Sequence, residues 1–337
     1  MITLGELAQR YDLVLSGDAQ RPVSGLAALS GAGPDDISFL SNKRHLSHLG
    51  NTRAAAVILH PDHVADCPVD SLACDNPYLA YARISGLFDR AAALPEGVHP
   101  AAVVSPEATL GEGVSVGANA VVESGAIIGA GAQIGANVYV GHESRVGARS
   151  RLYPGVVLYR DVSLGENCVV HSQAVIGGDG FGFAPGPDGW VKIHQLGGVR
   201  VGDNVEIGAC TTVDRGALDP TIIEDGVILD NQVHIAHNCY IGKNTAIAGC
   251  TGLAGSSIIG ANCTLAGAVG VAGHLEICDG VHVTGMTMVT KSITEPGAYS
   301  SGTPMSPNRE WRKNAVRFTQ LERMHQRLAA LEKKTDQ

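Results

Sequence analysis

An aliphatic residue recurs every six positions through most of this chain. The period runs without a slip from Val98 to Ile176, and after an interruption it resumes from Val201 to Val213. A second insertion shifts it by four residues, and it then continues from Ile223 to Val289. The next residue is often glycine, which permits a tight turn after each short strand. A helix repeats every 3.6 residues and cannot place these positions on one face.

Three six-residue units can close one triangular coil, and successive coils can stack at the ~4.8 Å spacing of neighbouring strands. The aliphatic residues then form continuous ladders that point inward. The periodic segments predict about nine to ten coils. Glycine is frequent, with 43 of 337 residues, while aromatic residues make up only 4%, so the core must consist mostly of Val, Ile, Leu and Ala.

Two segments interrupt the ladder. Gly177–Gly198 contains several glycines, two prolines, two phenylalanines and a tryptophan. A loop of this length in a compact solenoid is usually functional or contacts a partner, and the alternative is a loop that only covers a neighbouring surface. The shorter break, Asp214–Thr221, is predicted to form a turn through its Arg-Gly and Asp-Pro pairs.

Composition and periodicity divide the chain into three parts. Residues 1–97 have apolar residues at helical spacing from Leu4 to Ala8 and a compact strand from Ala54 to Leu59, which predicts a separate α/β domain. Residues 98–303 carry the repeats. Residues 304–337 carry apolar residues at three- and four-residue spacings, which predicts one amphipathic helix of about six turns. Such a helix should pair with copies of itself or pack on the body.

The charge and cysteine patterns narrow the class of protein. The net charge is −9, yet from Ser306 onward eight Lys and Arg face four Asp and Glu, so we expect an acidic partner at this tail. The eight cysteines have no zinc-site spacing, and we interpret them as reduced, buried thiols, with Cys168, Cys239 and Cys263 in packing roles. No apolar run is long enough for a transmembrane helix and no signal-peptide layout is present, which predicts a cytoplasmic protein without stable membrane insertion.

The segment from Asp230 to Asn238 is the strongest candidate for chemistry. It holds two His, two Asn, an Asp and a Gln in nine residues. Since Leu229 and Ile235 occupy core positions of the repeat, the polar groups must point outward or into a cleft between subunits. A neutral imidazole is suited to deprotonate an amine or hydroxyl nucleophile at neutral pH.

The 18-residue coil gives this assignment a geometric test. Adding 18 to His237 gives Gly255, which should lie one rung above the imidazole and present an unobstructed backbone N–H. Acyl transfer needs such a donor for its tetrahedral oxyanion. His274 follows His237 by about two coils and one residue, which places it in the adjacent column.

Several segments together resemble the UDP-3-O-(3-hydroxyacyl)glucosamine N-acyltransferases of lipid A biosynthesis, a family of hexapeptide-repeat acyltransferases. In the repeats these segments read VIGGDGFGFA, GWVKI, IAHNCYIGKNTAIAG, GHLEICDGVHVTGM and ITEPGAYSSGTP. ISFLSNKRH and NPYLAYARI are similar to that family's uridine-binding domain. The resemblance implies a mainly β fold, a left-handed parallel β-helix with a small N-terminal α/β domain and a C-terminal α-helical extension.

The resemblance also implies the reaction. It is transfer of a 3-hydroxyacyl group from acyl carrier protein to the 2-amino group of UDP-3-O-(3-hydroxyacyl)glucosamine, in a homotrimer with sites between subunits. The donor would be carried on the phosphopantetheine of acyl carrier protein, with no further cofactor, no metal and no nucleic acid.

The resemblance also implies roles for individual residues, according to their positions in these motifs. His237 would be the general base and the Gly255 amide would hold the oxyanion. His274 would contact the nucleotide phosphates. Phe39 would stack on uracil, and Asn42 would hydrogen-bond the edge of that ring.

Three further positions have less defined roles. His45 stands where family members often have a tyrosine that contacts the nucleotide. Asp230 could orient His237 or receive the substrate ammonium, and the sequence does not choose between these roles. Met286 and Met288 lie near the end of the ladder, and their flexible thioethers could close the floor of an acyl groove or could simply fill the core.

Three other functions compete with this interpretation. A γ-type carbonic anhydrase also uses a left-handed β-helix, but it would need a third histidine ligand beyond His234 and His237, and His274 is two coils away. A non-catalytic trimeric scaffold would not concentrate ionisable residues in one patch. A nucleotide-sugar acetyltransferase using acetyl-CoA is the nearest alternative among enzymes, and the C-terminal motifs argue against it.

Overall fold

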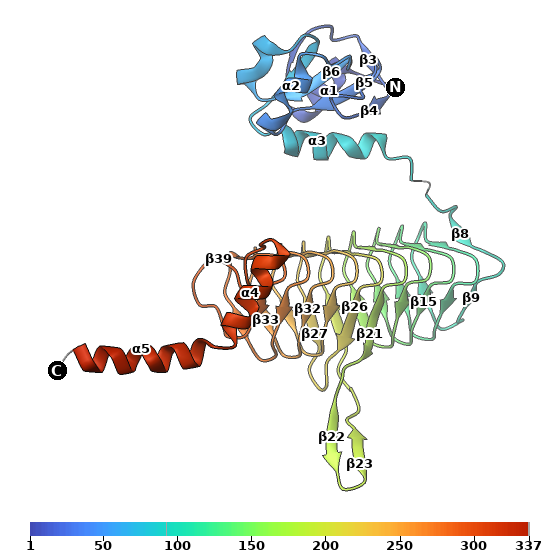
Figure 1. The fold of residues 1–337 in the computed structure, drawn as a ribbon. Helices are drawn as coiled ribbons and strands as arrows, with labels where there is room; N and C mark the ends of the chain where they lie inside the picture. The colour runs from blue at the N-terminus through green and yellow to red at the C-terminus, as the bar shows by residue number, and fades with distance from the viewer. Residues whose placement is uncertain (92, 336–337) are drawn as a thin grey trace. The chain divides into compact units, whose positions relative to one another are not determined.

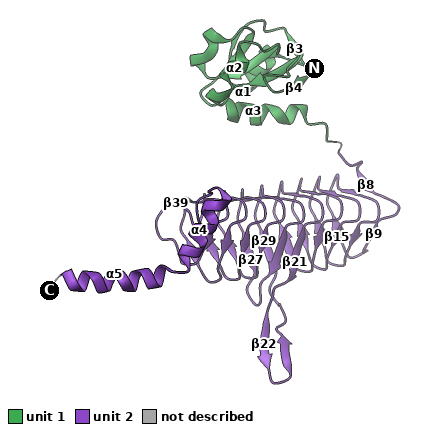
Figure 2. Ribbon diagram, in the orientation of Figure 1, with its two compact units in different colours: residues 1–92 green, residues 93–337 purple. Residues whose placement is uncertain are grey.

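The chain folds as two compact units, Met1–Ala92 and Ala93–Gln337 (Figure 2). The computed structural model describes residues 1–91 and 93–335. Each unit has hydrophobic clusters of its own, two in the first and one long cluster in the second.

The N-terminal unit is an α/β domain built on a five-stranded sheet. Its strand order is β2-β7-β6-β5-β4, and all neighbours are parallel except β2 and β7. The strands are β2 (Val14–Ser16), β4 (Gly25–Leu26), β5 (Asp36–Phe39), β6 (Ala56–Leu59) and β7 (Asp70–Ala73), with a separate pair β1 (Ile2–Thr3) and β3 (Pro22–Val23). The helices are α1 (Leu4–Tyr11), α2 (Leu46–Leu49) and α3 (Pro77–Ser85), with 3₁₀ turns η1 (Lys43–His45), η2 (Pro61–Asp66) and η3 (Gly86–Phe88).

Local sequence explains where the two predicted elements of this domain begin. The side chain of Thr3 accepts a hydrogen bond from the Glu6 N–H and the Glu6 carboxylate accepts one from the Thr3 N–H, so a capping box starts α1. Leu4 and Leu7 are buried on its inner face. The apolar run ending at Leu59 forms β6, buried on both sides in the middle of the sheet. The predicted helix and strand are confirmed.

The second unit is a parallel β-helix with three faces (Figure 1). In the described residues the faces contain nine, eleven and ten strands. The nine-stranded face is β10 (Thr109–Leu110), β13 (Ile127–Ile128), β16 (Arg145–Val146), β19 (Val162–Leu164), β24 (Val199–Val201), β27 (Thr221–Ile223), β30 (Tyr240–Ile241), β33 (Ile258–Ile259) and β36 (Glu276–Ile277). The predicted hexapeptide-repeat β-helix is confirmed.

The other two faces have the same two-residue strands at most rungs. The eleven-stranded face is β8 (Gly97–Val98), β11 (Ser115–Val116), β14 (Gln133–Ile134), β17 (Arg151–Leu152), β20 (Val169–Val170), β25 (Glu206–Ile207), β28 (Ile228–Leu229), β31 (Ala246–Ile247), β34 (Thr264–Leu265), β37 (Val281–Val283) and β39 (Gly297–Tyr299). The ten-stranded face is β9 (Val103–Val104), β12 (Val121–Val122), β15 (Tyr139–Val140), β18 (Val157–Leu158), β21 (Val175–Asp179), β26 (Thr212–Arg215), β29 (His234–Ile235), β32 (Gly252–Leu253), β35 (Gly270–Val271) and β38 (Met288–Val289).

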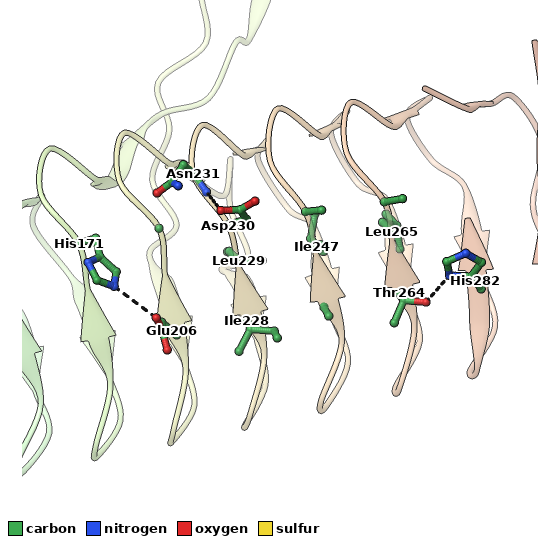
Figure 3. Close-up of a pocket in the computed structure, with 14 residues that line it drawn as sticks. His171, Glu206, Ile228, Leu229, Asp230, Asn231, Ile247, Thr264, Leu265 and His282 are labelled. Atoms are coloured by element: carbon green, nitrogen blue, oxygen red, sulfur yellow. Dashed lines mark hydrogen bonds and ion pairs between the residues drawn. The ribbon is translucent and has the colours of Figure 1, made fainter. Parts of the chain in front are cut away.

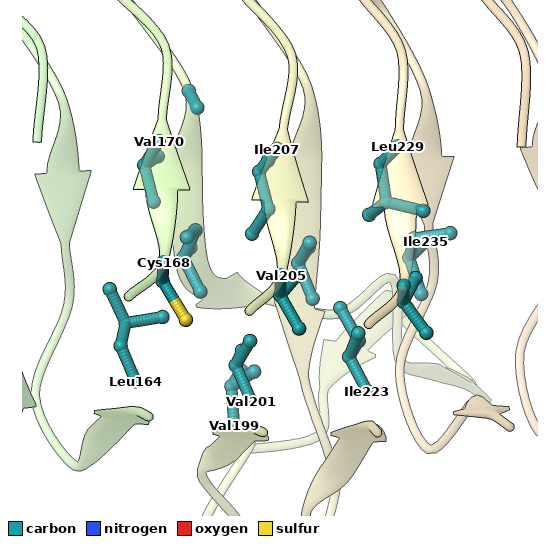
Figure 4. Packing of buried hydrophobic residues seen from close by; sticks show 14 of the residues in the cluster. Leu164, Cys168, Val170, Val199, Val201, Val205, Ile207, Ile223, Leu229 and Ile235 are labelled. Atoms are coloured by element: carbon teal, nitrogen blue, oxygen red, sulfur yellow. The ribbon is translucent and has the colours of Figure 1, made fainter. Parts of the chain in front are cut away.

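The repeat aliphatics form the inward ladders that the period predicts. Figure 4 shows Val170, Ile207 and Leu229 in line on successive rungs. The first rungs differ, because Val98 is 47% exposed where no earlier coil covers it, and full burial begins at Val116. Strand pairing in register keeps each aliphatic above the previous one, so one slip would turn the ladder outward.

Both segments that interrupt the ladder contain β-strand residues where the sequence predicted a loop or a turn. The segment 177–198 is a hairpin of β22 (Phe183–Gly186) and β23 (Gly189–Lys192), and not an irregular loop. The predicted turn over Asp214–Thr221 is wrong at its start, because β26 continues through Arg215 and pairs with a lengthened β21 beyond a bulge. Asp214 is therefore a strand residue with a fixed side-chain direction.

The predicted single C-terminal helix is two helices. They are α4 (Asn308–Phe318) and α5 (Leu321–Thr335), and the first ends where the Thr319 hydroxyl donates to the carbonyl of Val316. Apolar residues on both helices are about half exposed or more, among them Trp311, Phe318 and Leu328. None of the described helices has the length and hydropathy to cross a bilayer.

The cysteines are free, but only part of the expectation of burial holds. Cys168, Cys239 and Cys263 are buried in packing positions as predicted, and burial raises the pKa of Cys239 to about 11. Cys210 and Cys250 are exposed. These two occupy turn positions with positive φ, where the side chain points away from the core.

Candidate active site

His237 and Gly255 lie against each other on consecutive coils, as the 18-residue coil predicts. A Cβ built on Gly255 would lie 2.7 Å from both Cε1 and Nε2 of the His237 ring. The Nδ1 atom of His237 is 3.0 Å from Oδ1 of Asn238. Among the described residues, no backbone or side-chain acceptor takes the Gly255 N–H. The pair thus combines an imidazole with an open backbone donor, the two groups that acyl transfer to an amine requires.

A groove runs from this pair along the ten-stranded face. Its volume is about 410 Å³, and its walls include Phe181, Ala236, Leu253 and Val271. Strand register places His234, Gly252, Gly270 and Met288 in one outward-facing column. A Cβ on Gly252 would meet nothing within 4 Å, which leaves open space beside His234, whereas a Cβ on Gly270 would lie 2.9 Å from Sδ of Met288, so the methionine closes the channel there. This arrangement can hold an extended apolar chain.

Asp214 is a groove residue that the sequence analysis missed. Its side chain is 16% exposed, and its Oδ2 lies 3.9 Å from Nε2 of His234. Burial raises the pKa of the Asp214 carboxyl, while the nearby His234 and His237 partly offset that rise. The period did not reveal this residue, because Asp214 falls where the ladder breaks.

The root of the β22–β23 hairpin packs directly on the catalytic candidate. A Cβ on Gly180 would lie 2.6 Å from Cβ of His237, so only glycine fits there. Arg215, fully buried, donates from Nε to the Gly197 carbonyl at 2.7 Å and from Nη2 to the Arg160 carbonyl at 2.8 Å. These bonds tie the returning strand of the hairpin to the body and hold this wall of the groove.

Asp230 does not reach His237 within one chain. Its Oδ1 accepts a hydrogen bond from the Asn231 N–H at 2.7 Å and its Oδ2 one from the Gly249 N–H at 2.9 Å. Figure 3 shows it in a second pocket, of about 650 Å³, on the eleven-stranded face. The same pocket contains His171 and His282. Orientation of His237 by Asp230 of the same chain is therefore not supported.

Of the remaining predicted residues of the β-helix, His274 and Met288 lie beside His237 or along the groove, and Met286 does not. The His274 N–H donates to the Gly255 carbonyl at 3.1 Å, so its backbone adjoins the His237 column as predicted. Met288 lines the groove, 54% exposed. Met286 is 81% exposed on a turn with positive φ, so the core role for it is wrong. It is not among the residues that line the groove within the single chain, and its role at the floor of an acyl groove stays a prediction.

In the N-terminal domain, Phe39 is half-buried, and Tyr81 of α3 stacks on it with ring centroids 3.9 Å apart. Asn42 caps η1, accepting from the Arg44 N–H at 3.0 Å, and lines a pocket of about 300 Å³ with His60 and Asp75. His45 lies in η1 but is not among the residues of that pocket. Tyr81 had no role assigned from the sequence, although it lies in NPYLAYARI, one of the two segments that resemble the uridine-binding domain.

The described residues contain no group of three or more His, Cys, Asp or Glu side chains placed to hold a metal ion. His234 and His237 share the groove, but His274, the third ligand that a carbonic anhydrase would need, is not among its lining residues.

Comparison with known proteins identifies close relatives. The family model described as UDP-3-O-(3-hydroxymyristoyl) glucosamine N-acyltransferase, LpxD, matches residues 20–87, and the bacterial transferase hexapeptide model matches residues 107–142, 143–178 and 220–255. A UDP-3-O-acylglucosamine N-acyltransferase of Chromohalobacter salexigens is 62% identical over 98% of this chain and 96% of that protein. A protein of the same name from Pseudomonas aeruginosa (strain UCBPP-PA14) is 58% identical over 98% of this chain and 94% of that protein.

Among solved structures, an Arabidopsis UDP-N-acetylglucosamine acyltransferase matches with a TM-score of 0.52 and 25% identity, covering 67% of this chain and 80% of that one. This match agrees with the β-helix architecture.

Proposed function

This chain belongs to the UDP-3-O-acylglucosamine N-acyltransferase family, and from that premise we propose that it transfers a 3-hydroxyacyl group from acyl carrier protein, with His237 as the general base. The acceptor is the 2-amino group of UDP-3-O-(3-hydroxyacyl)glucosamine in lipid A biosynthesis. The observation that carries the proposal is the contact between the His237 ring and Gly255, whose N–H has no acceptor among the described residues.

The proposed mechanism assigns each proton. The substrate amine attacks the thioester carbonyl while His237 takes the proton that the nitrogen must lose. The carbonyl oxygen becomes an oxyanion, and the Gly255 N–H donates a hydrogen bond to it. When the carbon–sulfur bond breaks, the imidazolium returns its proton to the departing thiolate of the pantetheine arm. The amide product and the free thiol balance the reaction without a metal or a redox partner.

Asn238 and the groove support this assignment. The Asn238 Oδ1 atom can accept from Nδ1–H of His237, which leaves Nε2 unprotonated and able to act as the base. The open space over Gly252 gives the acyl chain a path from the reacting carbonyl toward Gly270, where the Met288 sulfur lies. Met288 would be the end of that path.

The assembly is proposed to be a homotrimer with sites between subunits. The two candidate half-sites, one around His237 and one around Asp230, lie on different faces of the same β-helix. A threefold arrangement would bring the Asp230 face of one subunit toward the His237 face of the next. This explains how Asp230 could contact substrate although it does not reach its own His237.

Subunit mixing tests that arrangement. His237→Ala and Asp230→Ala proteins should each be nearly inactive, and mixed trimers made by refolding them together should regain activity, because some interfaces combine an intact His237 with an intact Asp230. No recovery in mixed trimers of confirmed mass would contradict it.

The donor and compartment belong to the same proposal. Exposed basic residues on α4, including Arg312 and Lys313, offer a surface for the strongly acidic acyl carrier protein. Free cysteines, two of them exposed, fit the reducing cytoplasm. The direct test is turnover with a 3-hydroxyacyl carrier-protein thioester compared with acetyl-CoA. Turnover with acetyl-CoA alone would contradict the proposal.

A further inference from the structure

The groove contains three titratable side chains, Asp214, His234 and His237, and its other lining residues are apolar or glycine. His237 is assigned to the proton transfer. Asp214 and His234 have no part in that mechanism, yet they stand at the same end of the groove, opposite Met288. The Asp214 side chain is only 16% exposed, whereas that of His234 is 50% exposed at the mouth of the groove. A largely buried carboxylate costs free energy unless something hydrogen-bonds to it.

The geometry of the pair is that of an open hydrogen-bonding site. The Oγ1 atom of Thr212 lies 2.8 Å from Nδ1 of the His234 ring and holds that ring in place. With Thr212 donating to Nδ1, the ring proton is on Nε2, which faces Oδ2 of Asp214 at 3.9 Å. That separation is too long for a direct hydrogen bond, but both atoms can contact one oxygen placed beside them. Among the described residues, His234 is the one basic side chain with a nitrogen within 4.0 Å of the Asp214 carboxylate.

We propose that Asp214 and His234 bind the 3-hydroxyl group of the donor acyl chain and select 3-hydroxyacyl donors over unsubstituted ones. This inference rests on the proposed function, which supplies a 3-hydroxyacyl donor. A hydroxyl donates one hydrogen bond and accepts others, so it can donate to the Asp214 carboxylate and accept from Nε2–H of His234.

The position of the pair along the groove fits that substrate. The 3-hydroxyl is two carbons from the thioester carbonyl, and the carbonyl must lie between His237 and Gly255. His234 is on the strand that leads directly into the His237 turn, and Gly252, one rung later, leaves room above it. Beyond Gly252 the column offers only Gly270 and the Met288 thioether, which suit the rest of the chain. The hydroxyl, the polar group of the acyl chain besides its carbonyl, would thus meet the polar pair that the mechanism leaves unassigned among the described residues of the groove.

An analogue without the hydroxyl would leave both groups unpaired. Sites built to hydrogen-bond a substrate hydroxyl reject such analogues strongly, because the desolvated polar groups lose their partner. Selection should therefore appear in kcat/KM and not in the binding of the UDP-sugar.

The test compares two acyl carrier protein thioesters of equal chain length, one with the 3-hydroxyl and one without. Wild type should prefer the hydroxylated donor. In Asp214→Ala and His234→Ala, the ratio of kcat/KM values should fall by about tenfold or more, because alanine can neither accept from the hydroxyl nor donate to it, while the plain donor has no such bond to lose. His142→Gln is the matched control: His142 pairs with Glu143 at 3.6 Å on an exposed turn outside the groove, and its ratio should stay at the wild-type value.

Each other outcome has a defined meaning. An unchanged ratio in both variants, or a wild type that treats the two donors alike, overturns the inference. An equal loss with both donors also overturns it and assigns Asp214 to the support of His237 instead. If Asp214→Ala does not assemble, Thr212→Val, which releases Nδ1 of His234, replaces it. A wild type inactive with both donors contradicts the proposed function, which separates that failure from this one.

Discussion

The His237 imidazole occupies the space that a side chain on Gly255 would need. A Cβ at Gly255 would lie 2.7 Å from Nε2 of that ring, closer than Cβ atoms come to other atoms. The two residues are 18 positions apart, one turn of the coil, and the Ser256 N–H donates to the His237 carbonyl at 2.9 Å to fix the rung. The repeat itself thereby places the proposed base and the proposed oxyanion donor together.

Replacing His237 by Ala should abolish N-acyl transfer while leaving the protein folded. A positioned base typically contributes 10²–10⁴-fold to the rate, and the His237 side chain lies in the groove and not in the aliphatic ladder. Steady-state turnover measures the effect, with His142→Ala as an exposed-histidine control. Activity above about a tenth of wild type would be incompatible with a general-base role, and loss of folded protein would indicate a structural one.

Replacing Gly255 by Ala should push the His237 ring out of place and lower kcat by about tenfold or more, because the new methyl group overlaps the imidazole. Gly267→Ala is the matched control. Gly267 holds the same position two hexapeptides later, and its Cβ would meet only the Gly249 carbonyl oxygen, at an ordinary 3.4 Å. Equal activity of the two variants would refute the close contact.

Substitution of Phe39 should separate nucleotide binding from packing. Phe39→Leu keeps apolar volume in the N-terminal core but removes the ring that stacks with Tyr81. Because base stacking on an aromatic ring is worth about 1–3 kcal/mol, affinity for the UDP-sugar should fall at least several-fold, as titration calorimetry would measure. Tyr11→Leu, in the same hydrophobic cluster, should leave affinity unchanged. Unchanged affinity in Phe39→Leu would assign Phe39 to the core alone.

The Met288 side chain should limit acyl-chain length. Met288→Ala extends the channel that follows Gly252 and Gly270, so preference should shift toward longer hydroxyacyl donors in a competition assay. Met286→Ala provides the control, since Met286 is 81% exposed and outside the groove. An identical length profile in wild type and Met288→Ala would remove Met288 from the end of the channel.

Charge reversal on the tail should weaken the encounter with acyl carrier protein. Changing Arg312, Lys313 and Arg317 on α4 to Glu should raise the apparent KM for the carrier protein and flatten its dependence on salt, because these exposed charges act mainly on association. Each exposed pair contributes only about 0–1 kcal/mol, so the triple variant is needed. Binding of the UDP-sugar should not change. Normal carrier-protein kinetics at low salt would leave the tail with an assembly role only.

The period of six by itself determined the β-helix and much of the site. Because each strand pairs in register with the strand one coil later, counting 18 residues was enough to place Gly255 on His237 and His274 beside them. Helical spacing of apolar residues predicted α1, and a compact apolar run predicted β6.

Only the tertiary structure decided the contacts that neither the repeat nor local spacing specifies. Asp214 lines the groove because β26 continues past a bulge and pairs there with the longer β21. The six-residue period does not predict such a bulge. Asp230 lies on a different face of the β-helix from His237, because one corner of the coil separates the two residues. The direction of the chain at that corner depends on how the coil closes in three dimensions. Tyr81 met Phe39 because a helix packs across the sheet, and contacts between elements distant in the sequence are set by packing and not by local pattern.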